Sequence, residues 1–165
     1  MIKVYHGSYV EVKSPNISFS RNNLDFGKGF YVTPIREQAV SWALRWVRRK
    51  KKAILNTYVF SENLISELGL KFKEFSGYDQ EWLHFVADNR KGIISHEYDI
   101  VCGGVADDKV FNTLELYFGN LITEDEALNR LKYEKPNKQI CICKQELIES
   151  LLQFESSEEL SHGSK

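Results

Sequence analysis

Strand-like and helix-like apolar patterns follow one another irregularly along this chain of 165 residues. Alternating or continuous apolar runs predict five strands, over residues 2–6, 28–33, 53–60, 98–105 and 139–143. Stripes with helical spacing predict helices over residues 34–47, 79–91, 108–118, 124–131 and 147–152. Because strands and helices are interspersed without a regular strand–helix–strand repeat, the sequence predicts the α+β class.

Capping residues indicate where several of these helices begin and end. Thr33 is expected to cap the first helix, with Pro34 in the first helical position, where no amide hydrogen is needed. Asp107 or Asp108 is expected to cap the helix over 108–118, and Thr123 opens a Thr-x-x-Glu capping box. Two glycines that follow helical stripes predict helix ends: Gly92 and Gly119.

The length of the chain favours one hydrophobic core, so we expect a single domain over residues 1–154. Residues 155–165 are polar and lack a periodic apolar pattern, which predicts a flexible C-terminal tail. No apolar run approaches the roughly 20 residues that span a bilayer, and the N-terminus lacks the apolar core of a secretory signal. We therefore expect a cytoplasmic protein without a membrane partner.

Overall charge and cysteine content exclude several classes of function. The net charge of −1 gives no general attraction to nucleic acid or membranes. The three cysteines, Cys102, Cys141 and Cys143, are an odd number without Cys-x-x-Cys spacing, so neither a disulfide framework nor a zinc site is predicted. A local basic cluster, Arg45 to Lys52, can steer an anionic partner, although such clusters at helix ends are usually solvated surface.

The segment DFGKGFYVT, residues 25–33, places two glycines one residue apart directly before an aromatic strand. Glycine is used where the backbone needs a positive φ or where another group must come close. His6-Gly7-Ser8 ends the first predicted strand, and Gln139 begins the last one. Polar residues and glycines at strand ends, beside aromatic rings, predict a cleft for a flat polar ligand.

These segments also carry a family resemblance. YHGS followed by DFGKGFYVTPIREQAVSWA resembles ADP-ribosyltransferases of the diphtheria-toxin and poly(ADP-ribose) polymerase type, which carry histidine, tyrosine and a third polar residue on three separate strands. More narrowly, it is similar to a family of small bacterial stand-alone proteins that is described as a domain of unknown function. The resemblance implies two small, mostly antiparallel sheets that pack as a split sandwich with flanking helices.

The resemblance implies NAD as substrate, no metal, and a catalytic set of His6, Tyr31 and Gln139. His6 would bond the adenine-side ribose, and the Gly7 backbone would pair with the nicotinamide carboxamide. Tyr31 and Trp42 would stack on the two faces of the nicotinamide ring. Two further residues, Ser8 and Gly29, complete the implied NAD site.

Two residues depart from the family pattern. Gln139 stands where relatives of the polymerase type carry glutamate, so the acceptor for the ribose hydroxyl carries no charge. Ala39 stands where many members have a serine that bonds the carboxamide. The resemblance therefore implies single transfer of ADP-ribose to a protein or nucleic-acid acceptor with release of nicotinamide, in a toxin or effector that has a neutralising antitoxin partner.

Other interpretations of these residues stay open. The chain can be a weak or inactive NAD or ADP-ribose binding module, an NAD glycohydrolase, an enzyme acting on RNA phosphates, or a structural interaction protein. Trp42 can be a core residue of its helix, and Gln139 can be a plain strand residue. Asp107 and Asp108 offer another source of negative charge, with capping as the default role.

Overall fold

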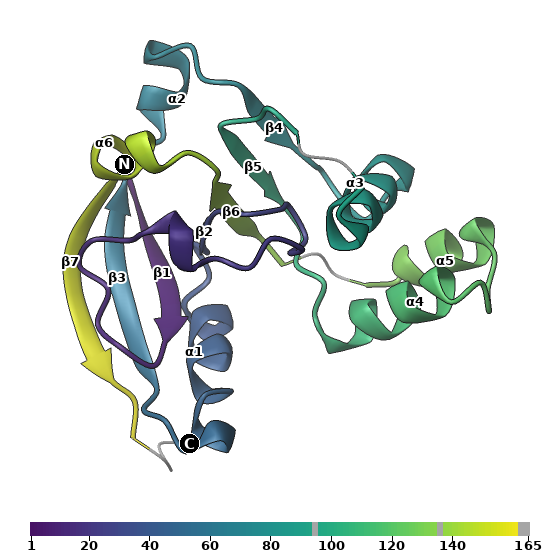
Figure 1. Cartoon of the computed structure of the whole chain (residues 1–165), viewed down its shortest axis with the longest axis horizontal. Coiled ribbons are helices and arrows are strands. Elements are labelled where there is room, and N and C mark those ends of the chain that lie inside the picture. The colour runs from purple at the N-terminus through teal and green to yellow at the C-terminus, as the bar shows by residue number, and fades with distance from the viewer. Residues whose placement is uncertain (94–95, 135–136, 162–165) are drawn as a thin grey trace.

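The computed structural model describes residues 1–93, 96–134 and 137–161. The described chain forms two small open sheets and six α-helices, which confirms the α+β class (Figure 1). Sheet A has the order β1-β3-β7 and consists of β1 (Ile2–Ser8), β3 (Ile54–Phe60) and β7 (Leu152–Glu159). Sheet B has the order β2-β6-β5-β4 and consists of β2 (Phe30–Val32), β6 (Gln139–Ile142), β5 (Ile100–Gly103) and β4 (Phe72–Glu74).

The strand pairs are antiparallel except β4 and β5, which run parallel. The helices are α1 (Arg36–Leu44), α2 (Asn63–Glu67), α3 (Gln80–Lys91), α4 (Asp108–Phe118), α5 (Glu124–Leu131) and α6 (Ile148–Leu151). Within the described ranges, short 3-10 turns cover Ile17–Phe19, Val47–Arg49 and Gln145–Leu147. No helix in the described part of the chain is long and apolar enough to cross a membrane.

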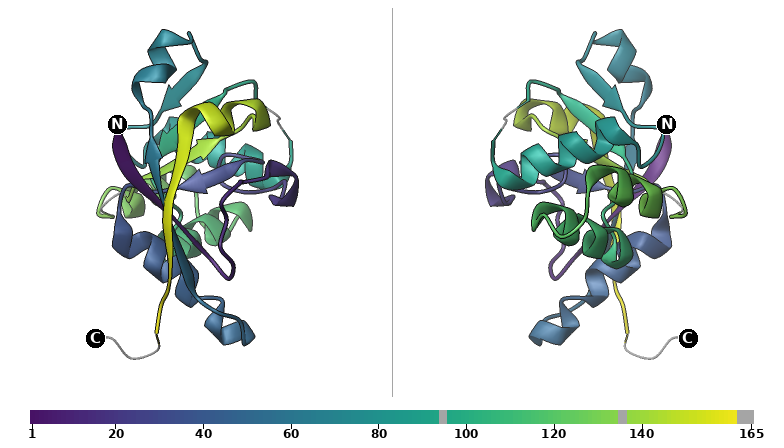
Figure 2. Two further views of the ribbon diagram at one scale, coloured as in Figure 1. Left: turned by 90° about the vertical axis from the view of Figure 1, so that its left-hand side faces the viewer. Right: turned by 90° about the vertical axis from the view of Figure 1, so that its right-hand side faces the viewer.

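Sheet B separates two hydrophobic cores. The inter-sheet core lies between the sheets and includes Val4, Phe30, Val32, Tyr58, Ile140 and Ile142. The helix-side core lies on the other face of sheet B, under α3, α4 and α5, and includes Phe26, Trp82, Val101, Leu114 and Cys141. Figure 2 shows these helices gathered on the side of sheet B away from sheet A. Because side chains alternate along a strand, neighbouring residues of β2 and β6 enter different cores.

One antiparallel bridge joins the two sheets where β1 passes β2. Tyr5 N donates to Thr33 O over 2.8 Å, and Thr33 N donates to Tyr5 O over 2.9 Å. The bridge brings the end of β1, with His6 and Gly7, next to the start of the segment that follows β2.

The structure confirms several predicted helix caps, and each of these caps is formed by residues close together in sequence. Asp107 Oδ1 accepts from Val110 N at the start of α4, and Thr123 Oγ1 accepts from Glu126 N at the start of α5. Gly92 ends α3 in the left-handed region with φ 67°, which favours glycine. Gly119 is the C-cap of α4.

The predicted start of the first helix is wrong. Helix α1 begins at Arg36, and Ile35 is its N-cap residue without a side-chain cap. The Thr33 hydroxyl donates to Lys138 O over 2.7 Å and accepts from Ile35 N, so it joins the chain to the start of β6. The helix also ends earlier than predicted, at Leu44, and Lys50 has φ 57° after the following 3-10 turn.

The predicted flexible tail is also wrong for most of its length. Residues up to Glu159 form β7, which pairs with β3 from Ile54↔Glu159 to Phe60↔Leu152. Leu160 N donates to Ala53 O over 2.8 Å and extends this contact. Residues 162–165 of the predicted tail lie outside the described residues. Strand β7 is therefore part of sheet A and not a tail.

Candidate functional site

His6 lies near the end of β1, partly exposed, with its ring against Phe30 at a centroid distance of 4.5 Å. Its Nδ1 is 2.8 Å from Tyr31 O. A carbonyl oxygen only accepts, so Nδ1 carries the hydrogen. Burial lowers the pKa of His6, and the bond to Tyr31 O opposes this shift, so the ring is neutral at pH 7 and Nε2 is an acceptor. Within the described residues, Nε2 makes no hydrogen bond.

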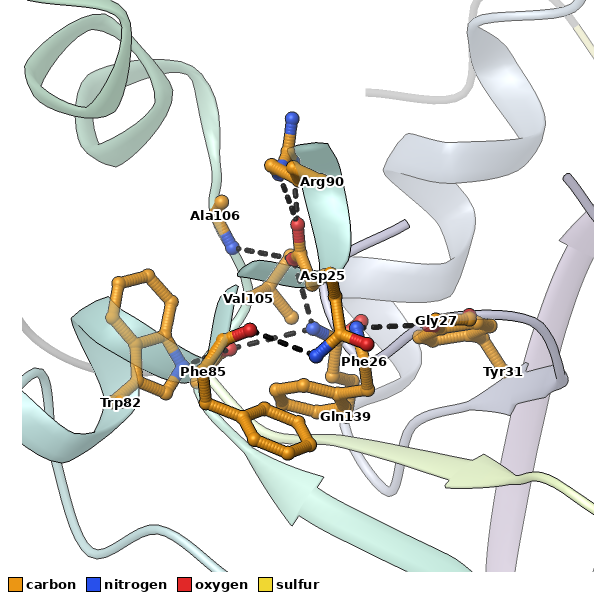
Figure 3. A network of polar contacts seen from close by, with 12 residues as sticks. Asp25, Phe26, Gly27, Tyr31, Trp82, Phe85, Arg90, Val105, Ala106 and Gln139 are labelled. Atoms are coloured by element: carbon orange, nitrogen blue, oxygen red, sulfur yellow. Dashed lines mark hydrogen bonds and ion pairs between the residues drawn. The ribbon is translucent and has the colours of Figure 1, made fainter. Parts of the chain in front are cut away.

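Tyr31 projects from β2 toward the helix-side core and is partly exposed. Its hydroxyl donates to Gly27 O over 2.5 Å and accepts from Phe26 N over 3.0 Å. Burial raises the pKa of Tyr31 well above its usual value, so the phenol stays protonated. The phenol thus closes the loop of residues 25–29 onto β2, as Figure 3 shows.

Gln139 begins β6 and faces the same core as Tyr31, with 4% of its surface exposed. Its Nε2 donates to Asp25 Oδ2 over 3.0 Å (Figure 3). The same nitrogen donates to Gly104 O over 3.3 Å. Both partners are acceptors, so they determine the orientation of the amide and use both of its hydrogens. The carbonyl Oε1 accepts no hydrogen bond from any described residue.

Asp25 is the centre of this network and was not assigned a role from the sequence. Its buried carboxylate accepts from Arg90 Nε over 2.8 Å, from Arg90 Nη2, from Ala106 N over 3.2 Å and from Gln139. A carboxylate that is buried without partners would be costly, and the Arg90 guanidinium compensates its charge. Since Asp25 and Arg90 are 65 residues apart in sequence, no local pattern indicates their pairing.

Gly7 and Trp42 lie together where β1 meets α1. A Cβ on Gly7 would lie 2.1 Å from Ala39 O and 2.5 Å from Ala43 N, so only glycine allows the helix this close. The same Cβ would lie 3.0 Å from Trp42 Cβ, and the Trp42 side chain is partly exposed. Packing against α1 therefore explains Gly7 without a ligand.

The paired glycines have two different structural roles. Gly27 has φ 83°, a backbone conformation that favours glycine, and turns the loop toward β2. Gly29 packs closely against β6. A Cβ at this position would lie 2.4 Å from Cys141 Sγ and 2.7 Å from Ile142 O, so a larger residue would not fit. Ser8 is buried, and its Oγ accepts from Val10 N at 3.5 Å.

The predicted catalytic residues are brought near one another but not onto one face. Tyr31 and Gln139 share the helix-side face of sheet B, linked through the loop that contains Asp25 and Phe26. His6 contacts the Tyr31 backbone, yet its ring packs on Phe30, which points to the opposite face of β2. Two cavities, of about 400 and 270 Å³, are lined by none of these three side chains.

The alternative acidic and basic groups have contacts of their own. Asp107 is the N-cap of α4, and Asp108 is an exposed partner of Arg45 at 3.6 Å. In the basic cluster, Lys51 Nζ lies 3.9 Å from the centroid of the Tyr9 ring, and Lys52 pairs with Glu159.

Among the described residues, no group of three or more His, Cys, Asp or Glu side chains is arranged to hold a metal ion.

Comparison with known proteins gives a family without an assigned activity. No curated protein and no solved structure matches the chain. A family model described as "Protein of unknown function (DUF3990)" matches residues 2–154, which is nearly the whole chain. The chain therefore belongs to the DUF3990 family of proteins of unknown function.

Proposed function

We propose that this protein is an NAD-dependent mono-ADP-ribosyltransferase that transfers ADP-ribose to a macromolecular acceptor and releases nicotinamide. The observation that carries the proposal is the state of His6. Its Nδ1–H is fixed on Tyr31 O, so a neutral ring presents Nε2 as an acceptor at the junction of the two sheets. A fixed acceptor of this kind suits a ribose hydroxyl.

Gln139 supports the same reaction through its carbonyl oxygen, which accepts no hydrogen bond from any described residue. Cleavage of the bond between ribose and nicotinamide leaves the electron pair on nicotinamide and positive charge on the ribose. An acceptor that is already oriented beside a ribose hydroxyl stabilises this charge. Asp25 accepts an amide hydrogen of Gln139, which increases electron density on Oε1 through hydrogen-bond cooperativity. In this proposal the Asp25 carboxylate polarises the Gln139 amide, whereas relatives of the polymerase type carry a glutamate carboxylate at the position of Gln139 itself.

In the proposed reaction a nucleophile of the acceptor attacks the ribose carbon and loses its proton, and no metal is required. Tyr31 and Trp42 would bind the nicotinamide ring, with Gly7, Ser8 and Gly29 lining the same site. The acceptor is a protein or a nucleic acid. A toxin or effector role in the bacterial cytoplasm, with an antitoxin protein as partner, remains part of this proposal.

A second candidate is a non-catalytic NAD or ADP-ribose binding module. One observation favours it: the Tyr31 hydroxyl and both amide hydrogens of Gln139 are occupied by contacts within the protein. Under this alternative, the two residues hold the loop of residues 25–29 and take no part in chemistry.

Incubation of the purified protein with labelled NAD tests both candidates. If it is a transferase, nicotinamide is released and label appears on an acceptor from a cell extract, and His6→Ala lowers both at least about 100-fold. Tyr31→Ala is expected to do the same. The matched controls are His84→Ala and Tyr133→Ala, since both residues lie on the surface.

The other outcomes separate the remaining possibilities. Free ADP-ribose without a labelled acceptor indicates an NAD glycohydrolase. Heat on titration with NAD, without nicotinamide release, indicates the binding module. No heat and no release would contradict both candidates and favour a structural interaction protein.

A further inference from the structure

Cys141 and Cys143 form a close thiol pair on the helix-side face of sheet B. Their Sγ atoms are 3.6 Å apart. Cys141 is fully buried, whereas Cys143 is partly exposed and follows Ile142, the last residue of β6. The third cysteine, Cys102, belongs to the inter-sheet core and is separated from the pair by the sheet.

The two thiols differ in acidity. The hydrogen bond from the Cys141 thiol lowers the pKa of Cys143 to about 6, and His96 and Lys144 act in the same direction against the effect of burial. Burial raises the pKa of Cys141 well above its usual value. At pH 7 the pair is therefore a partly exposed thiolate beside a buried thiol, which is the arrangement of an attacking and a resolving cysteine.

We propose that Cys143 and Cys141 are a peroxide-reactive pair that is oxidised to an intramolecular disulfide. The Cys143 thiolate attacks one oxygen of a hydroperoxide, and the O–O bond breaks. A sulfenic acid forms, and the leaving hydroxide or alkoxide takes up a proton from solvent and departs as water or an alcohol. The Cys141 sulfur then attacks the Cys143 sulfur. An S–S bond forms, the S–O bond breaks, and the leaving hydroxide departs as water with the Cys141 proton. Two thiols lose two electrons and two protons, and the peroxide is reduced.

The position of the pair connects its oxidation to the loop of residues 25–29. Cys141 Sγ occupies the space beside Gly29, where a Cβ would lie only 2.4 Å away. The His96 ring lies beside the same loop: its Nε2 donates to Phe26 O over 2.7 Å. Its Nδ1 accepts a hydrogen bond from Tyr98 N. Disulfide formation draws the Cys141 sulfur toward Cys143, so it removes packing beneath this loop. The inference on oxidation does not depend on the proposed function.

Mass spectrometry of unreduced tryptic peptides tests the proposal directly. Trypsin cuts after Lys138 and Lys144, so one peptide, QICICK, contains both cysteines, and Cys102 lies in a different peptide. After treatment with hydrogen peroxide, this peptide should lose two hydrogen atoms. Titratable thiols in the unfolded protein should fall from three to one. Reduction should restore both values.

Variants assign the roles of the two sulfurs. Cys102→Ser should leave disulfide formation unchanged, and Cys143→Ser should abolish it. Cys141→Ser should accumulate a sulfenic acid on Cys143 that a dimedone probe captures. The proposal is overturned if QICICK keeps both thiols, if it gains oxygen without losing hydrogen, or if only disulfides between chains form. The wild-type peptide decides these outcomes even if a variant fails to fold.

Discussion

The Gln139 amide donates to two acceptors, Asp25 and the Gly104 carbonyl. A carboxylate at this position has nothing to donate and would face the Asp25 carboxylate at hydrogen-bond distance. We therefore expect Gln139→Glu to lower the free energy of unfolding by about 1–3 kcal/mol at pH 7. Urea unfolding of the variant and the wild type at pH 7 measures this loss.

Gln153→Glu is the matched control, because it makes the same change on an exposed residue of β7. The control should change the unfolding free energy by less than about 0.5 kcal/mol. Equal stability of the two variants at pH 7 would contradict the role of Gln139 as a donor to Asp25.

The low pKa of Cys143 gives a second prediction for a single residue. Iodoacetamide reacts with the thiolate, so alkylation of Cys143 in the folded protein should reach half its maximal rate near pH 6. The Cys102 thiol, with its pKa raised by burial to about 12, should stay unreacted at neutral pH. Peptide mapping after timed labelling measures both. A midpoint close to about 8.5, the value of a free cysteine, would contradict the prediction.

Single residues also show what the sequence can and cannot predict. His6, Tyr31 and Gln139 were selected from their motifs, and the structure brings Tyr31 and Gln139 to one face but leaves the His6 ring on the other. Asp25 is the first residue of the segment DFGKGFYVT, yet its role depends on Arg90 and Gln139, which are distant in sequence. Ion pairs between distant residues leave no periodic pattern, so they could not be predicted.

At the scale of secondary-structure elements, Gly7 determines how closely β1 and α1 pack. The nearest atoms to an added Cβ, Ala39 O and Ala43 N, belong to the backbone and cannot move independently of the helix. We expect Gly7→Ala to lower the unfolding free energy by about 1–3 kcal/mol or more. Gly77→Ala is the control, because a Cβ there meets no atom within 4 Å. If both variants unfold at the same urea concentration, the close packing of β1 and α1 is not needed for stability.

Elements were predicted best where their signals are local. The caps of α4 and α5 are side chains that bond amides three residues away, so the sequence contains both partners. The prediction that Thr33 caps α1 is wrong because its hydroxyl donates instead to Lys138 O, more than one hundred residues later in the chain. Strand β7 was missed because its sequence, LQFESSEE, is largely polar and exposed, as is common for a strand at the edge of a sheet.

At the scale of the whole molecule, β7 completes sheet A by pairing with β3, a strand that is almost entirely buried. A chain that ends at Phe154 loses the partners of residues 54–57. We expect its unfolding free energy to fall by at least about 2 kcal/mol, since several backbone hydrogen bonds are lost. A chain that ends at Ser161 is the control and should match the full-length protein in urea unfolding. Equal stability of both truncated chains would contradict a structural role for β7.

The bridge between Tyr5 and Thr33 also limits how the two halves of the molecule can move. Its two hydrogen bonds are the paired backbone contacts that join sheet A to sheet B within the described residues. The bridge therefore holds β1 and the end of β2 together at the point where the two sheets meet. His6 follows the bridge by one residue, so the same two backbone hydrogen bonds that join the sheets also keep its imidazole within reach of the Tyr31 carbonyl.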